Sequence, residues 1–101
     1  MIANVSIFPI GKGSSLSRHV AEAVLEAEKS GLDYRLTSMG TILEGDWDEV
    51  LAVVKKMRNR LAKHSDRLYL TISIDDRKGA KKRLDGKVKS VEKILGKKPA
   101  R

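Results

Sequence analysis

The sequence contains no cysteine, few aromatic residues and no long apolar run. A chain without cysteine forms no disulfide, no thiolate nucleophile and no cysteine-ligated metal site. Because no stretch of about 18 apolar residues occurs, we expect no membrane-spanning helix. The first seven residues alternate like a β-strand and follow no basic segment. We therefore expect no signal peptide and a cytoplasmic location.

The positive charge is concentrated in the last quarter of the chain. The net charge is +8, with 10 Lys/Arg and 11 Asp/Glu in residues 1–76 against 11 and 2 in residues 77–101. A basic segment of this kind suggests nucleic-acid binding through phosphate contacts. However, aromatic side chains that stack on bases are scarce, and none follows Tyr69. We therefore favour a solvated basic helix over a nucleic-acid partner, and we keep nucleic-acid association as the alternative function.

Hydrophobic periodicity predicts seven elements in a chain whose length suits one two-layered domain. Strands are expected at residues 2–8, 33–38, 41–44 and 67–75, the last as a central strand, and helices at 16–27, 46–61 and 84–95. This order predicts an α+β, ferredoxin-like βαββαβ antiparallel sandwich with an added C-terminal helix. Residues 1–101 then form one domain, with a sandwich body at 1–76 and a basic helix and tail at 77–101.

Short polar signals predict several helix ends. Ser14 or Ser15 is placed to cap the first helix, and Gly31 to accept the left-handed conformation just beyond its end. Asp46, followed three residues later by Glu49, has the spacing of a capping box at the start of the second helix.

The sheet face away from the two packed helices is predicted to be mixed in character. Alternation along the first strand puts Ala3, Val5 and Ile7 on the core face. The opposite face carries polar and aromatic side chains, namely Ser6, Phe8, Tyr69, Thr71 and Ser73. Such a face favours coverage by a second subunit, so we expect the protein to associate with itself.

The glycine-rich turn Gly11-Lys12-Gly13-Ser14 connects the first strand to the first helix. Backbone N–H groups at a turn of this kind, together with the helix dipole, can bind an anion, and Lys12 would assist. The turn lacks the second upstream glycine of a P-loop. The alternative is a tight turn closed by a serine cap, without any ligand.

The predicted hairpin around Met39 carries three hydroxyl groups and one carboxylate. Thr37, Ser38 and Thr41 supply the hydroxyls, and Glu44 is the acid of an otherwise neutral strand. These groups could bond a polar heterocycle or an amine, and the alternative is ordinary turn chemistry with an edge carboxylate.

The only tryptophan, Trp47, follows this hairpin at the start of the second helix. It either packs in the core or an interface, or stacks on a ring bound near Glu44.

No group of residues suggests catalysis, a cofactor or a metal. Asp75 and Asp76 are neighbours in sequence, and neighbouring strand residues point to opposite faces, so an ion pair or a subunit contact with Arg77 is favoured over a shared metal. His19 and His64 are separated by 45 positions and are interpreted as solvated surface residues. Nothing resembles a catalytic triad or a pair of acid–base carboxylates, so we expect no enzyme activity.

Several motifs taken together resemble the thiamine-binding protein family over nearly the whole chain. They are Pro9-Ile10-Gly11-Lys12-Gly13, Ser15-Leu16-Ser17, Gly31-Leu32-Asp33-Tyr34, Met39-Gly40-Thr41-Ile42-Leu43-Glu44-Gly45, Ile74-Asp75-Asp76-Arg77 and Lys87-Val88-Lys89-Ser90-Val91. The resemblance implies a ferredoxin-like subunit that forms dimers and usually tetramers. It also implies a cytoplasmic protein without known catalysis, some of whose relatives bind thiamine or its hydroxymethylpyrimidine part.

The same resemblance implies positions for a ligand. The matching residues are Thr41 and Glu44, with Ser38 and Gly40 beside them, and Ser6 and Phe8 are expected to line the same pocket from the first strand. A carboxylate suits an aminopyrimidine because it accepts a hydrogen bond from the exocyclic amine. The resemblance therefore implies a small-molecule binder with its pocket between elements or between subunits.

Overall fold

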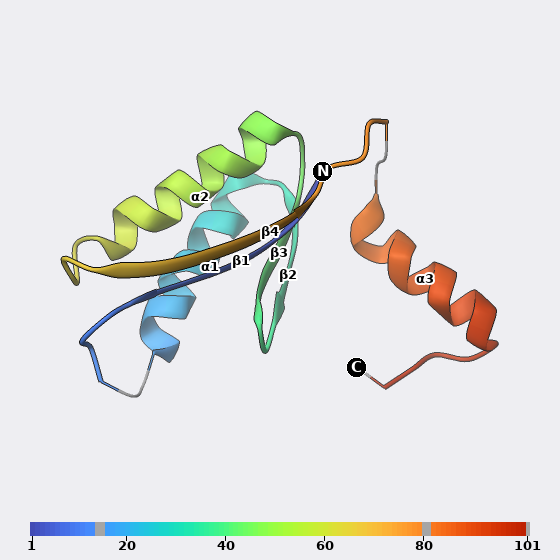
Figure 1. Ribbon diagram of the computed structural model, residues 1–101, viewed down its shortest axis with the longest axis horizontal. Helices are drawn as coiled ribbons and strands as arrows, with labels where there is room; N and C mark the ends of the chain where they lie inside the picture. The colour runs from blue at the N-terminus through green and yellow to red at the C-terminus, as the bar shows by residue number, and fades with distance from the viewer. Residues whose placement is uncertain (14–15, 80–81, 101) are drawn as a thin grey trace.

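A computed structural model describes residues 1–13, 16–79 and 82–100 and confirms the predicted α+β architecture (Figure 1). Its elements are β1 (Ile2–Pro9), α1 (Ser17–Ser30), β2 (Asp33–Thr37), β3 (Gly40–Glu44), α2 (Trp47–Leu61), β4 (Leu68–Asp75) and α3 (Arg83–Leu95). The four strands form one sheet in the order β2-β3-β1-β4, and every neighbouring pair is antiparallel. This is the ferredoxin-like arrangement, with α3 added at the C-terminal end.

One face of the sheet packs on α1 and α2 and forms the core. Ala3, Val5 and Ile7 of β1 point to this face and are at most 6% exposed. Because residues paired across strands share a face, the register places Leu43 and Thr41 of β3 there as well. Apolar residues of both helices complete the core, namely Ala23, Ala27, Val50, Val53, Val54, Met57 and Leu61. The predicted core face of β1 is therefore confirmed.

The ends of the two core helices differ in how they are capped. At α2 the capping box is present, because the Asp46 side chain accepts from the Glu49 nitrogen at 2.8 Å and the Glu49 carboxylate accepts from the Asp46 nitrogen at 3.0 Å. Helix α1 instead begins at Ser17, with Leu16 at the cap position and no side-chain bond there. The predicted caps Ser14 and Ser15 lie outside the described residues. Gly31 has φ = 76°, as predicted for the residue that ends α1.

The prediction of a central position for β4 is wrong, because β4 is an edge strand. It pairs with β1 alone, from Asp75 opposite Ile2 to Leu68 opposite Pro9. Its alternation still marks a core face, but only part of that face is covered by the helices. As a result, Leu70 and Ile74 remain 40% and 38% exposed.

Helix α3 lies across the sheet from α1 and α2 (Figure 1). It contacts β2 and β3, and none of its residues is buried. Its apolar side chains Val91, Ile94 and Leu95 are at least 50% exposed. Polar contacts, described below, join α3 to the body, and Leu84 and Val88 are its partly buried apolar residues.

Across the described ranges, no helix is both long enough and apolar enough to span a membrane.

Candidate functional site

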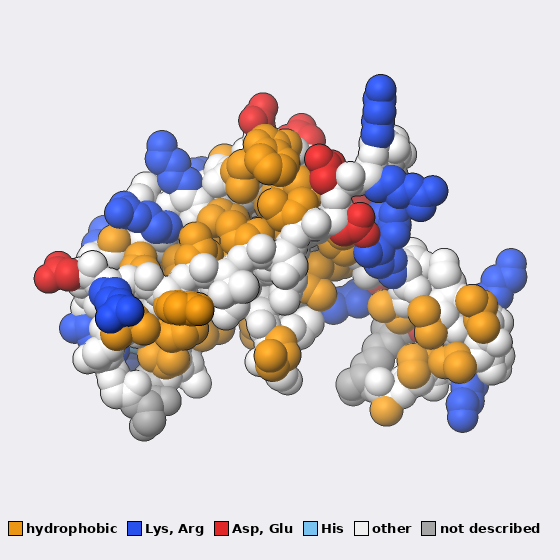
Figure 2. Space-filling view, in the orientation of Figure 1, with side chains coloured by type: hydrophobic (Ala, Val, Ile, Leu, Met, Phe, Trp, Pro, Cys, Tyr) orange, Lys and Arg blue, Asp and Glu red, His pale blue; other side chains and the backbone are white. Residues whose placement is uncertain are grey.

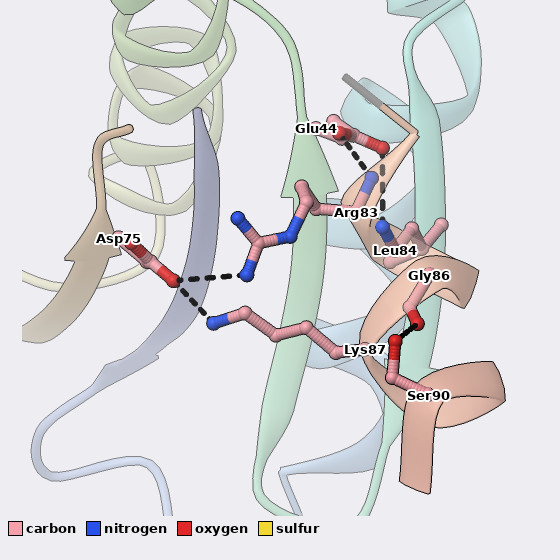
Figure 3. A network of polar contacts seen from close by, with 7 residues as sticks. All are labelled: Glu44, Asp75, Arg83, Leu84, Gly86, Lys87 and Ser90. Atoms are coloured by element: carbon pink, nitrogen blue, oxygen red, sulfur yellow. Dashed lines mark hydrogen bonds and ion pairs between the residues drawn. The ribbon is translucent and has the colours of Figure 1, made fainter. Parts of the chain in front are cut away.

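Glu44 is the central residue of the polar region between the sheet and α3. As the last residue of β3 it pairs with Ile2 on one side and Asp33 on the other. Its side chain points away from the core helices and is held by the start of α3 (Figure 3). One carboxylate oxygen accepts from the backbone nitrogen of Arg83 at 2.6 Å, and the other accepts from that of Leu84 at 3.2 Å. With an exposed fraction of 9%, Glu44 is nearly buried.

These bonds explain how α3 begins without a local cap. The cap position is held by Lys82, whose backbone is left-handed (φ = 55°) and whose side chain makes no capping bond. The first N–H groups of a helix have no partner within the helix and must find one elsewhere. A carboxylate at this end also interacts favourably with the helix dipole. Glu44 therefore caps α3 from a strand about 40 residues earlier in the sequence.

A second set of charged contacts fixes the side of α3 that faces the sheet. Asp75 at the end of β4 bonds Lys87, and Arg83 lies 3.8 Å from the same carboxylate (Figure 3). The bond to Lys87, more than the nearby charges of Lys87 and the arginines, lowers the pKa of Asp75 below its ordinary value. A third contact joins Arg35 of β2 to Asp85. Within one chain Lys87 and Arg83 are therefore the ion-pair partners of Asp75, and Arg77 acts on it as a nearby positive charge. A subunit contact through Arg77 stays a prediction.

Two clefts meet at Glu44. One, of about 550 Å³, is also lined by Trp47, Asp33 and Asp76 and by the β4–α3 connection. The other, of about 390 Å³, lies along α3 and is lined by Arg35 and Asp85 among others. Lys82 borders both clefts. Trp47 is 51% exposed, so in this chain it lies at the cleft and not in the core.

The hairpin residues predicted to act with Glu44 are divided between the two faces of the sheet. Thr41 pairs with Val5 and is buried on the core face, opposite to Glu44. Thr37 donates to the Gly40 carbonyl at 2.9 Å and accepts from the Met39 nitrogen at 3.2 Å. The alternative of ordinary turn chemistry therefore describes Thr37. Ser38 is exposed in the same turn.

Ser6 and Phe8 do not reach the Glu44 clefts within one chain. They share the open face with Glu44, but Phe8 pairs with Tyr69 and stacks on its ring at 5.5 Å. Ile2 is the β1 residue opposite Glu44. Since a strand rises about 3.3 Å per residue, Phe8 lies about 20 Å further along the sheet. The residues predicted to line one pocket thus belong to opposite ends of the open face.

Gly11, Lys12 and Gly13 form an exposed turn, as predicted. Gly11 and Gly13 both have positive φ, at 84° and 82°. Ser14 lies outside the described residues, so the anion site stays a prediction.

His19 and His64 are neighbours in space, which corrects their interpretation as separate surface residues. Their rings are 4.8 Å apart, and His64 bonds Glu22 at 2.7 Å. The spacing of three between His19 and Glu22 on one helix was the available sequence signal. His64 comes close to these two residues only through the packing of α1 on the end of α2, which the sequence does not reveal.

A four-stranded antiparallel sheet, two helices on one face and a polar site under a third helix define a small ferredoxin-like protein. The chain belongs to the family described as thiamine-binding protein, whose model matches residues 3–92.

Several relatives match this chain over most of its length. The chain is 35% identical to the UPF0045 protein MJ1052 of Methanocaldococcus jannaschii, over 93% of this chain and 94% of the relative. It is 42% identical to a UPF0045 protein of Methanothermobacter thermautotrophicus, over 92% of this chain and 97% of the relative.

Solved structures agree with the fold. The crystal structure of the hypothetical protein MJ1052 matches with a TM-score of 0.82 and 37% identity, covering 89% of this chain and 93% of that one. A putative thiamine biosynthesis/salvage protein of Thermotoga maritima matches with a TM-score of 0.78 over 89% of this chain and 96% of that one. Its identity is 21%, so this second likeness concerns the fold alone.

Proposed function

We propose that this protein is a non-catalytic binder of thiamine or a related hydroxymethylpyrimidine. The proposed site is the 550 Å³ cleft lined by Glu44 and Trp47. The observation that carries the proposal is the meeting of a fixed carboxylate and a half-exposed indole in one cleft of suitable size. The family description supports this ligand class, and the Thermotoga maritima protein of the same fold is itself described as a putative thiamine biosynthesis/salvage protein.

The carboxylate of Glu44 retains capacity for a ligand. An ionised carboxylate has about four acceptor positions, and α3 uses one on each oxygen. The two backbone bonds also fix its orientation, which reduces the ordering cost of binding. An aminopyrimidine would donate its exocyclic amine to the remaining positions, while the Trp47 ring offers a stacking surface.

The charge of the cleft differs from that of the whole chain. Within the described part of the chain, five carboxylates line it against three basic side chains. The acids are Asp33, Glu44, Asp46, Glu49 and Asp76, and the basic residues are Arg77, Lys78 and Lys82. Among the described residues the cleft thus carries more acidic than basic side chains, which favours a cationic ligand such as thiamine even though the protein carries a net charge of +8.

We further propose that the protein assembles with itself, as a homodimer or homotetramer, in the cytoplasm. Apolar side chains exposed on the body and on α3 support self-association (Figure 2). Size-exclusion chromatography with light scattering tests this, and a monomer at all accessible concentrations would refute it. The family description and the relatives named above give no support to nucleic-acid binding. In addition, Arg83 and Lys87 of the basic helix already pair with Asp75.

Isothermal titration calorimetry with thiamine and with hydroxymethylpyrimidine tests the proposed ligand class. We expect saturable binding of one of them, weakened about tenfold or more in Glu44→Gln through loss of a charge-assisted hydrogen bond. Trp47→Ala should also weaken binding, and Ser6→Ala, at the far end of the open face, should leave it unchanged. Absence of heat with both compounds would contradict the ligand class. Unchanged affinity in both Glu44→Gln and Trp47→Ala would contradict the site.

A further inference from the structure

A cluster of three potential metal ligands lies on the helix side of the molecule, away from Glu44. His19 and Glu22 come from α1, and His64 follows the end of α2. The spacing of three places His19 and Glu22 on one face of their helix. The turn after α2, in which the His64 nitrogen donates to the Leu61 carbonyl at 3.0 Å, directs His64 toward that face. Packing of α1 on α2 therefore builds the cluster.

One member of the cluster has an unmet bonding requirement. Nδ1 of His19 is buried and has no hydrogen-bond partner among the described residues. Nε2 of His64 is hydrogen-bonded to the Glu22 carboxylate at 2.7 Å, but this bond does not involve His19. Buried polar atoms normally have partners, so an unpaired imidazole nitrogen beside a second imidazole and a carboxylate is unusual.

The geometry points to a site for a divalent transition metal, with Zn²⁺ as the best match, bound by His19, Glu22 and His64. Two imidazoles and one carboxylate are a donor set that zinc accepts while keeping a fourth position open. The three donor atoms lie within 4.8 Å of one another. Ligands about 2.0–2.1 Å from a tetrahedral zinc are about 3.3 Å apart, so small side-chain rotations would bring these donors into place.

The surroundings allow a metal ion to enter and to be held. An open cleft of about 480 Å³ is lined by Glu22 and His64 and gives access to the cluster. Arg60, also at this cleft, is neutralised by Glu26 at 3.0 Å. Lys56 and Lys63 border the same cleft, and Glu22 supplies the charge that offsets the metal ion. The sequence predicted no metal because it lacks cysteine and because its histidines are 45 positions apart.

The test uses tag-free protein and Zn²⁺ alone, with bound metal measured by equilibrium dialysis and elemental analysis. We expect one zinc per chain. The dissociation constant should rise at least about tenfold in His19→Ala, Glu22→Gln and His64→Ala, since even outer-shell changes cost about that much. Asn59→Ala is the matched control, because it alters the lining of the same cleft without touching the cluster or changing a charge, and it should bind zinc as the natural chain does.

A second measurement uses the unaltered protein, so it tests the site even if the variants fail to fold. Zn²⁺ titration followed by NMR should shift the ring signals of both His19 and His64 and saturate at one equivalent. Substitution by Co²⁺ should produce visible absorption typical of a four-coordinate site. Absence of saturable zinc binding, ring signals that do not move, or equal affinity in all the ligand variants would overturn the proposal.

Discussion

The carboxylate of Glu44, at the end of β3, lies 2.6 Å from the backbone nitrogen of Arg83, the first residue of α3. This bond joins the sandwich body to the basic C-terminal helix. It also gives Glu44 two tasks in our account, because the same side chain lines the proposed ligand cleft. The two tasks are separable by experiment, since helix capping and ligand affinity have different readouts.

Replacing Glu44 should loosen α3 before it affects the core. In Glu44→Ala the N–H groups of Arg83 and Leu84 lose their acceptors, which costs about 1 kcal/mol at a helix N-terminus. Hydrogen exchange in the first turn of α3 should then quicken about fivefold. The exchange rate in Glu44→Gln should lie between those of the natural chain and Glu44→Ala, because the glutamine side chain keeps one acceptor oxygen. Asp46→Ala is the control, since it removes the cap of α2 instead. Unaltered exchange in α3 of Glu44→Ala would show that the helix is held by other contacts.

The ion pair of Asp75 with Lys87 should make the docking of α3 depend on pH. The pKa of Asp75 lies below its ordinary value of 3.8 because Lys87 stabilises the charged carboxylate. The contribution of this ion pair to the stability of the folded protein is therefore fully present above pH 3.8 and is lost as the pH falls through the lowered pKa of Asp75. An NMR titration of the Asp75 carboxyl carbon should give a midpoint that rises toward the ordinary value in Lys87→Met. The same midpoint in both proteins would remove Lys87 as the cause.

Gly40→Ala should destabilise the hairpin. Gly40 has φ = 154°, and an added Cβ would lie 2.8 Å from the Val5 carbonyl oxygen and 2.6 Å from Oδ1 of Asn4. The contact with the Val5 carbonyl is with backbone and does not relax easily, so we expect a loss of about 1–3 kcal/mol in the free energy of unfolding.

Gly86→Ala is the matched control for the same measurement by chemical denaturation. Gly86 lies within α3 and has open space at its Cβ position. Alanine should therefore strengthen α3 by up to about 1 kcal/mol without disturbing the body. If the free energy of unfolding of Gly40→Ala falls by less than about 0.5 kcal/mol, the hairpin adjusts to the extra carbon and the prediction is contradicted.

The fold was predictable because its local signals agree with one another. The alternation of Ala3, Val5 and Ile7 and the capping box of Asp46 and Glu49 each depend on residues close in sequence. Strand position in the sheet is different, since it depends on which edges pair. The strong alternation of residues 68–75 therefore indicated a strand but not that it lies at the edge.

The site was less predictable because its parts meet only through tertiary packing. Counting along β3 could have separated Thr41 from Glu44, because an odd spacing puts two side chains on opposite faces. The contact of Glu44 with the start of α3 has no local signal, since backbone N–H groups are the partners. The same holds for His64, which joins His19 and Glu22 through helix packing.

The most direct test of the proposed ligand site is an NMR titration of the protein with hydroxymethylpyrimidine and with thiamine. The indole N–H of Trp47 is a unique reporter, because the chain has one tryptophan. Our account predicts saturable shifts at Trp47 and at the backbone amides around Glu44 and Lys82, with the amides of Ser6 and Phe8 unaffected. Shifts confined to the Ser6 and Phe8 end, or no shifts with either compound, would contradict it.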